Sequence, residues 1–151
     1  MELRRRNGSD SRCCVKREVP LTWRNHVDGS HPSVVAFDRW LASLAPFARV
    51  IELGEIEELM EAAAYGQLWE SADAKTPIKA INEHPEIFEL RRRGLSKALR
   101  FYHAEPEGLP SALVAIHRHI KTGPREQQRE IEYAAQRYEL GAEDGWEATN
   151  S

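Results

Sequence analysis

Cationic and aromatic side chains recur at alternate positions in three segments of the sequence, residues 86–93, 96–104 and 111–121. A period of two predicts three strands, and it places these side chains together on one face of a sheet. They are Arg91, Arg93, Arg100, Tyr102, His117, His119 and Lys121. Guanidinium and ammonium groups bind phosphates, and Tyr and His rings stack on unpaired bases. The face therefore suits single-stranded RNA, and the alternative is a solvated face with scattered charges.

The chemistry open to these groups is phosphodiester transfer. The sequence contains no G-x-S-x-G, P-loop, G-x-G-x-x-G or H-E-x-x-H motif, so the common nucleophilic, nucleotide-binding and zinc-protease sites are not indicated. In RNA cleavage the 2′-hydroxyl attacks the adjacent phosphate. Arg or Lys neutralises the charge that develops, and Lys, Tyr or His transfers the protons.

Histidine and cysteine spacing gives little indication of a metal site. His117 and His119 would point the same way on a strand and could bind zinc, but no third ligand has an obvious spacing, although His103 could lie nearby. Packing or polar residues of the sheet face are the favoured interpretation. Cys13 and Cys14 are adjacent in a basic segment, which favours reduced thiols over a disulfide or a zinc site. We expect no metal and no cofactor.

The opposite parity of the three strands is apolar and predicts a buried face. It comprises Phe88, Leu90, Leu99, Phe101, Val114 and Ile116. Arg118 falls on this apolar parity, and a β-bulge or a position near the sheet edge would accommodate it. The short connections between the strands predict an antiparallel meander with one buried face.

Helical periodicity predicts the elements that cover the buried face. Apolar residues step by three and four after Pro32 (Val34 to Leu44), after Pro46 (Val50 to Ala63) and after Pro124, as in amphipathic helices that begin at a proline. A short strand over residues 15–23 precedes them. The sequence therefore predicts an α+β fold, a small antiparallel sheet with an N-terminal helical hairpin and a C-terminal helix.

Length and composition predict a single domain. The 151 residues include no apolar run of the length that crosses a bilayer, and the first residues lack the apolar stretch of a secretory signal, so we expect a cytoplasmic protein. We expect a flexible basic tail over residues 1–18, a folded domain over 19–141 and a polar tail over 142–151.

The net charge of −3 conceals a strong division along the chain. Residues 1–25 carry +4 and residues 86–137 carry +3, whereas residues 26–85 carry −6 and residues 138–151 carry −4. A basic field for nucleic acid can come only from the two positive segments. The glutamates of the second predicted helix, between residues 52 and 61, form either a solvated face or an acidic binding surface.

Four stretches of the sequence resemble HigB-type toxins of the RelE/ParE superfamily, from bacterial and phage type II toxin–antitoxin systems. Residues 28–44 resemble the start of the family's first helix, and IFELR at 87–91 and KALRFY at 97–102 resemble two of its strands. Residues 114–135, VAIHRHIKTGPREQQREIEYAA, resemble its last strand and helix. Together the resemblance spans about residues 19–141.

The resemblance implies a ribosome-dependent mRNA endoribonuclease that needs no metal and inhibits translation. Its partners would be a helix-turn-helix antitoxin, the ribosome and mRNA. Arg91, Arg100 and Lys121 match the family's pattern as groups that bind phosphate and stabilise the transition state, and His117 and Tyr102 are candidates for stacking or proton transfer. His119 stands where the family often has Phe. Two alternatives are an inactive toxin fold that only binds an antitoxin-like regulator and a ParE-like gyrase inhibitor.

Overall fold

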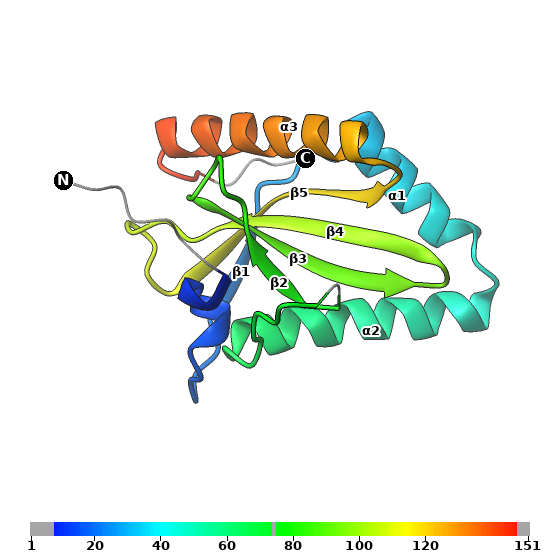
Figure 1. Cartoon of the computed structure of the whole chain (residues 1–151), viewed down its shortest axis with the longest axis horizontal. Helices are drawn as coiled ribbons and strands as arrows, with labels where there is room; N and C mark the ends of the chain where they lie inside the picture. Colours follow the sequence, from blue (N-terminus) through cyan, green and yellow to red (C-terminus); the bar gives the residue numbers. More distant parts are fainter. Residues whose placement is uncertain (1–7, 74, 148–151) are drawn as a thin grey trace.

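A computed structural model describes residues 8–73 and 75–147 of the chain (Figure 1). It is an α+β fold in which a five-stranded sheet lies between helices, which confirms the predicted fold class. The elements in chain order are η1 (Gly8–Asp10), η2 (Arg12–Cys14), β1 (Thr22–Asn25), α1 (Pro32–Ser43), α2 (Pro46–Ala64), β2 (Ile78–Ala80), β3 (Ile87–Gly94), β4 (Lys97–Ala104), β5 (Ala112–Lys121) and α3 (Pro124–Glu143).

The sheet is mixed rather than antiparallel. Its strand order is β1-β5-β4-β3-β2. β3 to β5 form the predicted antiparallel meander, and the short strand β2, which was not predicted, extends it. The prediction is wrong at the other edge, because β1 pairs in parallel with β5. The four residues of β1 carry no sequence pattern that distinguishes parallel from antiparallel pairing. The path of the chain through α1 and α2 therefore decides the direction of β1.

Helices cover both faces of the sheet, so the predicted open face is wrong. Figure 1 shows α2 and α3 on opposite sides of the sheet. Phe88, Leu90 and Leu99 pack with residues of α1 and α2, while Ile87, Tyr102 and Val114 pack with Ala134 and other residues of α3. A helix of 20 residues that follows β5 folds back over the sheet and covers part of the face that carries the polar side chains.

A β-bulge in β5 reverses which alternate residues of this strand point to each face of the sheet. Tyr102 pairs with His117 and His103 pairs with Ala115, so Ile116 is the extra residue. Arg118 therefore points toward α1, where it bonds to Asp38 and lies 5.7 Å from the centre of the Phe37 ring. This confirms the bulge that the parity of Arg118 predicted. The same bulge places Val114 and Ile116 in the α3 cluster, not in the cluster with Phe88 as predicted.

The first half of α2 does not bury the residues that its apolar periodicity predicts to be buried. Val50 and Leu53 were expected to be buried, but their side chains are 66% and 40% exposed, and Glu52 is buried instead. Glu52 makes two hydrogen bonds to Arg92 on β3, of 2.7 and 3.0 Å. A buried carboxylate needs such a partner, and this contact sets which side of the helix faces the sheet.

Residues 8–14 of the expected N-terminal tail pack against the domain, whereas Val15, Lys16 and Glu18 are exposed. Cys13 and Ser11 are fully buried. The Arg12 guanidinium donates to the carbonyl oxygens of Pro106, Leu109 and Ala112, beside the loop between β4 and β5. Residues 1–7 of the predicted tail lie outside the described residues.

The described part of the C-terminal segment contains one buried side chain, that of Trp146. Trp146 is 7% exposed and belongs to the cluster under α3. A Cβ atom at Gly141 would collide with the Trp146 ring, so this glycine makes room for the ring rather than ending the helix, which continues to Glu143. The other residues from 142 to 147 are exposed, and residues 148–151 of the expected polar tail lie outside the described part.

Candidate functional site: a cationic pocket at the sheet edge

The free edge of β3 forms one wall of a cationic pocket. β2 pairs with β3 only from Phe88 to Leu90, so β3 continues beyond its neighbour. A cavity of about 530 Å³ lies there, and the described residues that line it include five cationic residues and no carboxylate. The lining residues are Lys75, Thr76, Arg91, Arg92, Arg93, Ala98 and Arg100. Such a concentration of guanidinium groups suits phosphate or another oxyanion.

One buried carboxylate organises two of these arginines. Arg91 and Arg100 are cross-strand partners on β3 and β4. Arg91 Nε donates to Glu89 Oε1 at 2.6 Å, and Arg100 Nε lies 3.7 Å from the same oxygen. Burial lowers the pKa of Arg100, and Glu89 opposes this effect. Two guanidinium groups share one carboxylate, so a net positive charge remains beside the pocket.

Glu89 also fastens α3 to the sheet. Gln127 on α3 donates from Nε2 to Glu89 Oε2 at 2.7 Å, and the same nitrogen lies 2.9 Å from Tyr102 Oη. Tyr102 Oη is in turn 2.9 Å from His119 Nε2, and the two rings stack. Burial, followed by the nearby Glu89, raises the pKa of the Tyr102 phenol. The phenol therefore stays protonated within this network.

His117 belongs to a second hydrogen-bonded network. Its Nε2 is 2.7 Å from Glu130 Oε1, and Glu130 Oε2 accepts a bond from Ser33 Oγ. His31 lies beside both side chains, close enough that the three ligand atoms of His31, His117 and Glu130 fall within 4.8 Å. His31 Nδ1 accepts the Ser33 N–H, and both Glu130 oxygens are in use. The network joins α1, β5 and α3.

The pocket therefore contains some of the predicted site residues and not others. Arg91 and Arg100 line it, and Lys121 is the cross-strand partner of the lining residue Ala98. Tyr102 and His117 are each 1% exposed beneath α3 and do not line the pocket. A ligand bound there would meet guanidinium groups but neither of these two side chains.

Sequence reasoning missed several residues that shape the pocket. Lys75 lies in a segment with no clear periodicity, and Arg92 has the parity of the buried face. Glu89 has the parity of the polar face, yet it is 3% exposed. A glutamate at the centre of an alternating strand, flanked by arginines, was the available signal, because a buried carboxylate requires cationic or hydrogen-bonding partners.

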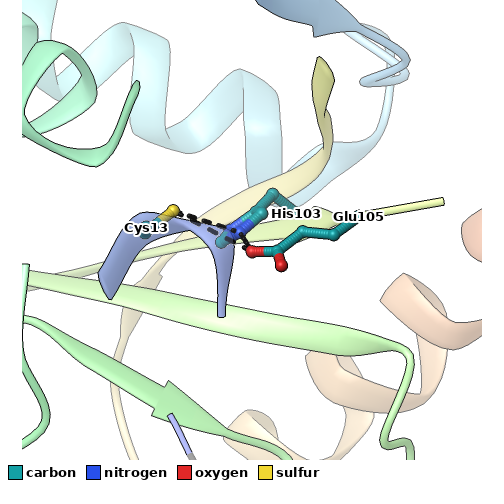
Figure 2. Close-up of side chains that lie close together, drawn as sticks. All are labelled: Cys13, His103 and Glu105. Atoms are coloured by element: carbon teal, nitrogen blue, oxygen red, sulfur yellow. Dashed lines mark hydrogen bonds and ion pairs between the residues drawn. The ribbon is translucent and has the colours of Figure 1, made fainter. Parts of the chain in front are cut away.

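A third cluster lies away from the pocket and contains Cys13, His103 and Glu105 (Figure 2). His103 and Glu105 form a buried ion pair with a separation of 2.8 Å. Burial alone would lower the pKa of His103, but Cys13 and Glu105 raise it to about 10. The sequence predicts reduced thiols and no metal, because nothing in its spacing places Cys13 beside β4.

Comparison of the chain with protein-family models, with curated proteins and with solved structures finds no match in any of the three. No helix within residues 8–73 and 75–147 has both the length and the apolar character to cross a membrane. The assignment of a function therefore depends on the residues and their geometry.

Proposed function

We propose that the protein is the toxin of a type II toxin–antitoxin system, a ribosome-dependent mRNA endoribonuclease that binds RNA at the edge of its sheet. The observation that carries the proposal is the pocket of about 530 Å³ whose lining includes five cationic residues, Lys75 and four arginines of β3 and β4. The resemblance of residues 19–141 to HigB-type toxins supports the choice of RNA among polyanions.

In this proposal Arg91 and Arg100 bind the non-bridging oxygens of the scissile phosphate. Glu89 holds both guanidinium groups in place before the substrate arrives, which reduces the reorganisation needed as negative charge develops. Lys75 and Arg93 bind neighbouring phosphates. The new bond joins the 2′-oxygen to phosphorus, and the bond from phosphorus to the 5′-oxygen breaks.

In this proposal Lys121, which the resemblance places among the phosphate-binding groups, gives a proton to the leaving 5′-oxygen, and the proton of the 2′-hydroxyl passes to water. The two side chains that the sequence predicts for proton transfer, Tyr102 and His117, are each only 1% exposed, whereas Lys121 is partly exposed at the end of β5. Tyr102 and His117 then act as positioning residues, since their hydrogen bonds hold α3 against β4 and β5.

Inducible expression with mapping of mRNA 5′ ends tests the proposal. Wild type is expected to arrest growth and to create new mRNA ends, while Arg91→Ala/Lys121→Ala does neither. Arg129→Ala, which removes a charge from an exposed position on α3, is the control and is expected to behave as wild type. Unimpaired growth with no new ends from the intact chain would contradict the proposal, and DNA damage without new ends would favour gyrase inhibition.

The burial of three aromatic or imidazole side chains favours a second candidate function. Tyr102, His117 and His119 leave few groups for acid–base chemistry at the surface. An inactive toxin fold that only binds an antitoxin-like regulator would need none. This candidate predicts a stable complex with the product of an adjacent gene, no RNA cleavage, and the same affinity for that partner after Arg91→Ala/Lys121→Ala.

A further inference from the structure

The cluster of Cys13, His103 and Glu105 joins the N-terminal segment to the sheet. Cys13 lies on η2, His103 lies near the end of β4, and Glu105 follows that strand directly. Figure 2 shows the thiol, the imidazole and the carboxylate turned toward one another. The three residues are 0%, 1% and 9% exposed. They take no part in the cationic pocket, so the function proposed above does not use them.

The three ligand atoms have the mutual spacing of a metal site. Cys13 Sγ is 3.6 Å from His103 Nε2 and 3.9 Å from Glu105 Oε2, and the nitrogen and oxygen are 2.8 Å apart. Tetrahedral zinc with sulfur at about 2.3 Å and with nitrogen and oxygen at about 2.0–2.2 Å separates its ligand atoms by roughly 3.3–3.6 Å. Shifts of about half an ångström would fit the cluster to an ion.

The arrangement does not suit nucleophilic catalysis. In a relay, the carboxylate bonds to one ring nitrogen of the histidine and the nucleophile to the other. Here Cys13 and Glu105 both contact Nε2, and His103 Nδ1 is buried without a hydrogen-bond partner among the described residues. Cys13 is also fully buried, so a substrate would not reach its sulfur. Convergence of three donors on one point is what a metal ion requires.

Neighbouring groups fix two of the three side chains, Glu105 and His103. The Arg12 N–H donates to Glu105 Oε1 at 2.8 Å, and the Ser11 hydroxyl donates to Glu105 Oε2. The His103 ring stacks on Phe88 and meets the edge of Trp23. Groups that orient the ligands in this way raise metal affinity in known sites.

One of the three residues, Glu105, adjoins a cavity. Glu105 lines a cavity of about 610 Å³ between the loop after β4 and the end of α3, where Pro106, Leu109 and Trp146 also contribute. Three protein ligands leave one position of a tetrahedral ion open for a water molecule or for the Ser11 hydroxyl.

We propose that Cys13, His103 and Glu105 bind one zinc ion, which fastens the N-terminal segment to the sheet. A thiolate, an imidazole and a carboxylate together favour zinc over magnesium or calcium, which prefer oxygen ligands alone. The bound form needs a thiolate and a neutral imidazole, so binding releases the protons that these groups carried. Zinc should then stabilise the folded chain, because the unfolded chain does not assemble the ligands.

Cobalt(II) titration of the untagged full-length protein tests the proposal. Wild type is expected to bind one cobalt per chain with a thiolate-to-cobalt charge-transfer absorption, which zinc then abolishes by displacement. Cys13→Ser is expected to lose this absorption. Cys14→Ser is the matched control, because the neighbouring thiol contacts the Gly8 carbonyl rather than the cluster, and it is expected to keep the absorption.

A second variant distinguishes the loss of a zinc ligand from a folding defect. Glu105→Gln keeps the thiol and the imidazole, and it is expected to weaken zinc binding at least about tenfold while circular dichroism shows a folded chain. Zinc is also expected to raise the Tm of wild type and of Cys14→Ser. A wild-type protein without the charge-transfer absorption, or an absorption that survives Cys13→Ser, would overturn the proposal. Neither result bears on RNA cleavage, so the two proposals fail separately.

Discussion

Several polar side chains of this protein are buried and contact other buried side chains. His119 shows this most clearly, since it lies 3% exposed beneath α3 with its ring on Tyr102. Burial lowers the pKa of His119 to about 4, although Glu130 and Glu89 favour its charged form. Burial is also the main cause that lowers the pKa of the neighbouring His117. His119 therefore stays neutral in the folded protein under mildly acidic conditions.

The protein should lose stability as the pH falls from about 6.5 to 4. In this window the unfolded chain protonates His119 and the folded chain does not, so protons favour unfolding. The shift corresponds to a loss on the order of 2–3 kcal/mol. His119→Gln is expected to flatten the fall in the free energy of unfolding, measured with urea at several pH values. His84→Gln, near the surface beside Glu86 and Glu132, should leave the wild-type slope. Equal slopes for wild type and His119→Gln would refute the assignment.

At the scale of elements, polar contacts decide how the helices lie on the sheet. α2 faces β3 with Glu52 rather than with Val50 or Leu53. The contact is also tight, because a Cβ atom at Gly94 would lie 2.6 Å from the Glu52 carboxylate oxygens. On the other side, Gln127 and Glu130 bond α3 to β3, β4 and β5.

Loss of the Glu52 carboxylate should weaken the joint between α2 and β3. Glu52→Ala leaves the partly buried Arg92 without its two hydrogen bonds, and we expect a loss of about 2 kcal/mol in the free energy of unfolding. Glu57→Ala removes an exposed charge from the same helix and should cost less than about 0.5 kcal/mol. Thermal and urea unfolding measure both. Indistinguishable stabilities of the two variants would show that the Glu52 contact contributes nothing.

At the scale of the whole molecule, positive charge is concentrated at one pocket of a protein whose net charge is −3. Residues 26–85 carry −6, yet Lys75 from that segment joins arginines of β3 and β4 at the pocket. A local cationic pocket on an acidic molecule should bind RNA with little long-range steering, so contacts in the pocket account for most of the affinity.

Binding of a single-stranded RNA oligonucleotide should therefore weaken with salt, and less steeply after a pocket arginine is removed. Each lost phosphate contact lowers the slope of log affinity against log salt by about 0.7 for single strands. We expect this decrease for Arg91→Ala and an unchanged slope for Arg129→Ala, both measured by fluorescence anisotropy. Unchanged affinity and slope after Arg91→Ala would place the RNA elsewhere or remove it from the function.

The sequence by itself determined the three helices, three of the five strands, and the residues of β3 and β4 that share a face. Apolar steps of three and four located the three helices, and alternation located β3, β4 and β5. The parity of Arg118 even indicated the bulge. Arg91 and Arg100 could be placed side by side because both follow from the period of two and an antiparallel hairpin.

Only the tertiary structure decided what covers each face and which distant segments meet. Local periodicity says that a helix has an apolar side, but it does not say whether that helix leaves Tyr102 and His117 open or buried. It also cannot bring Cys13 to His103, 90 residues away. Such contacts depend on how the chain returns across the sheet, which is a property of the packed molecule and not of any window of sequence.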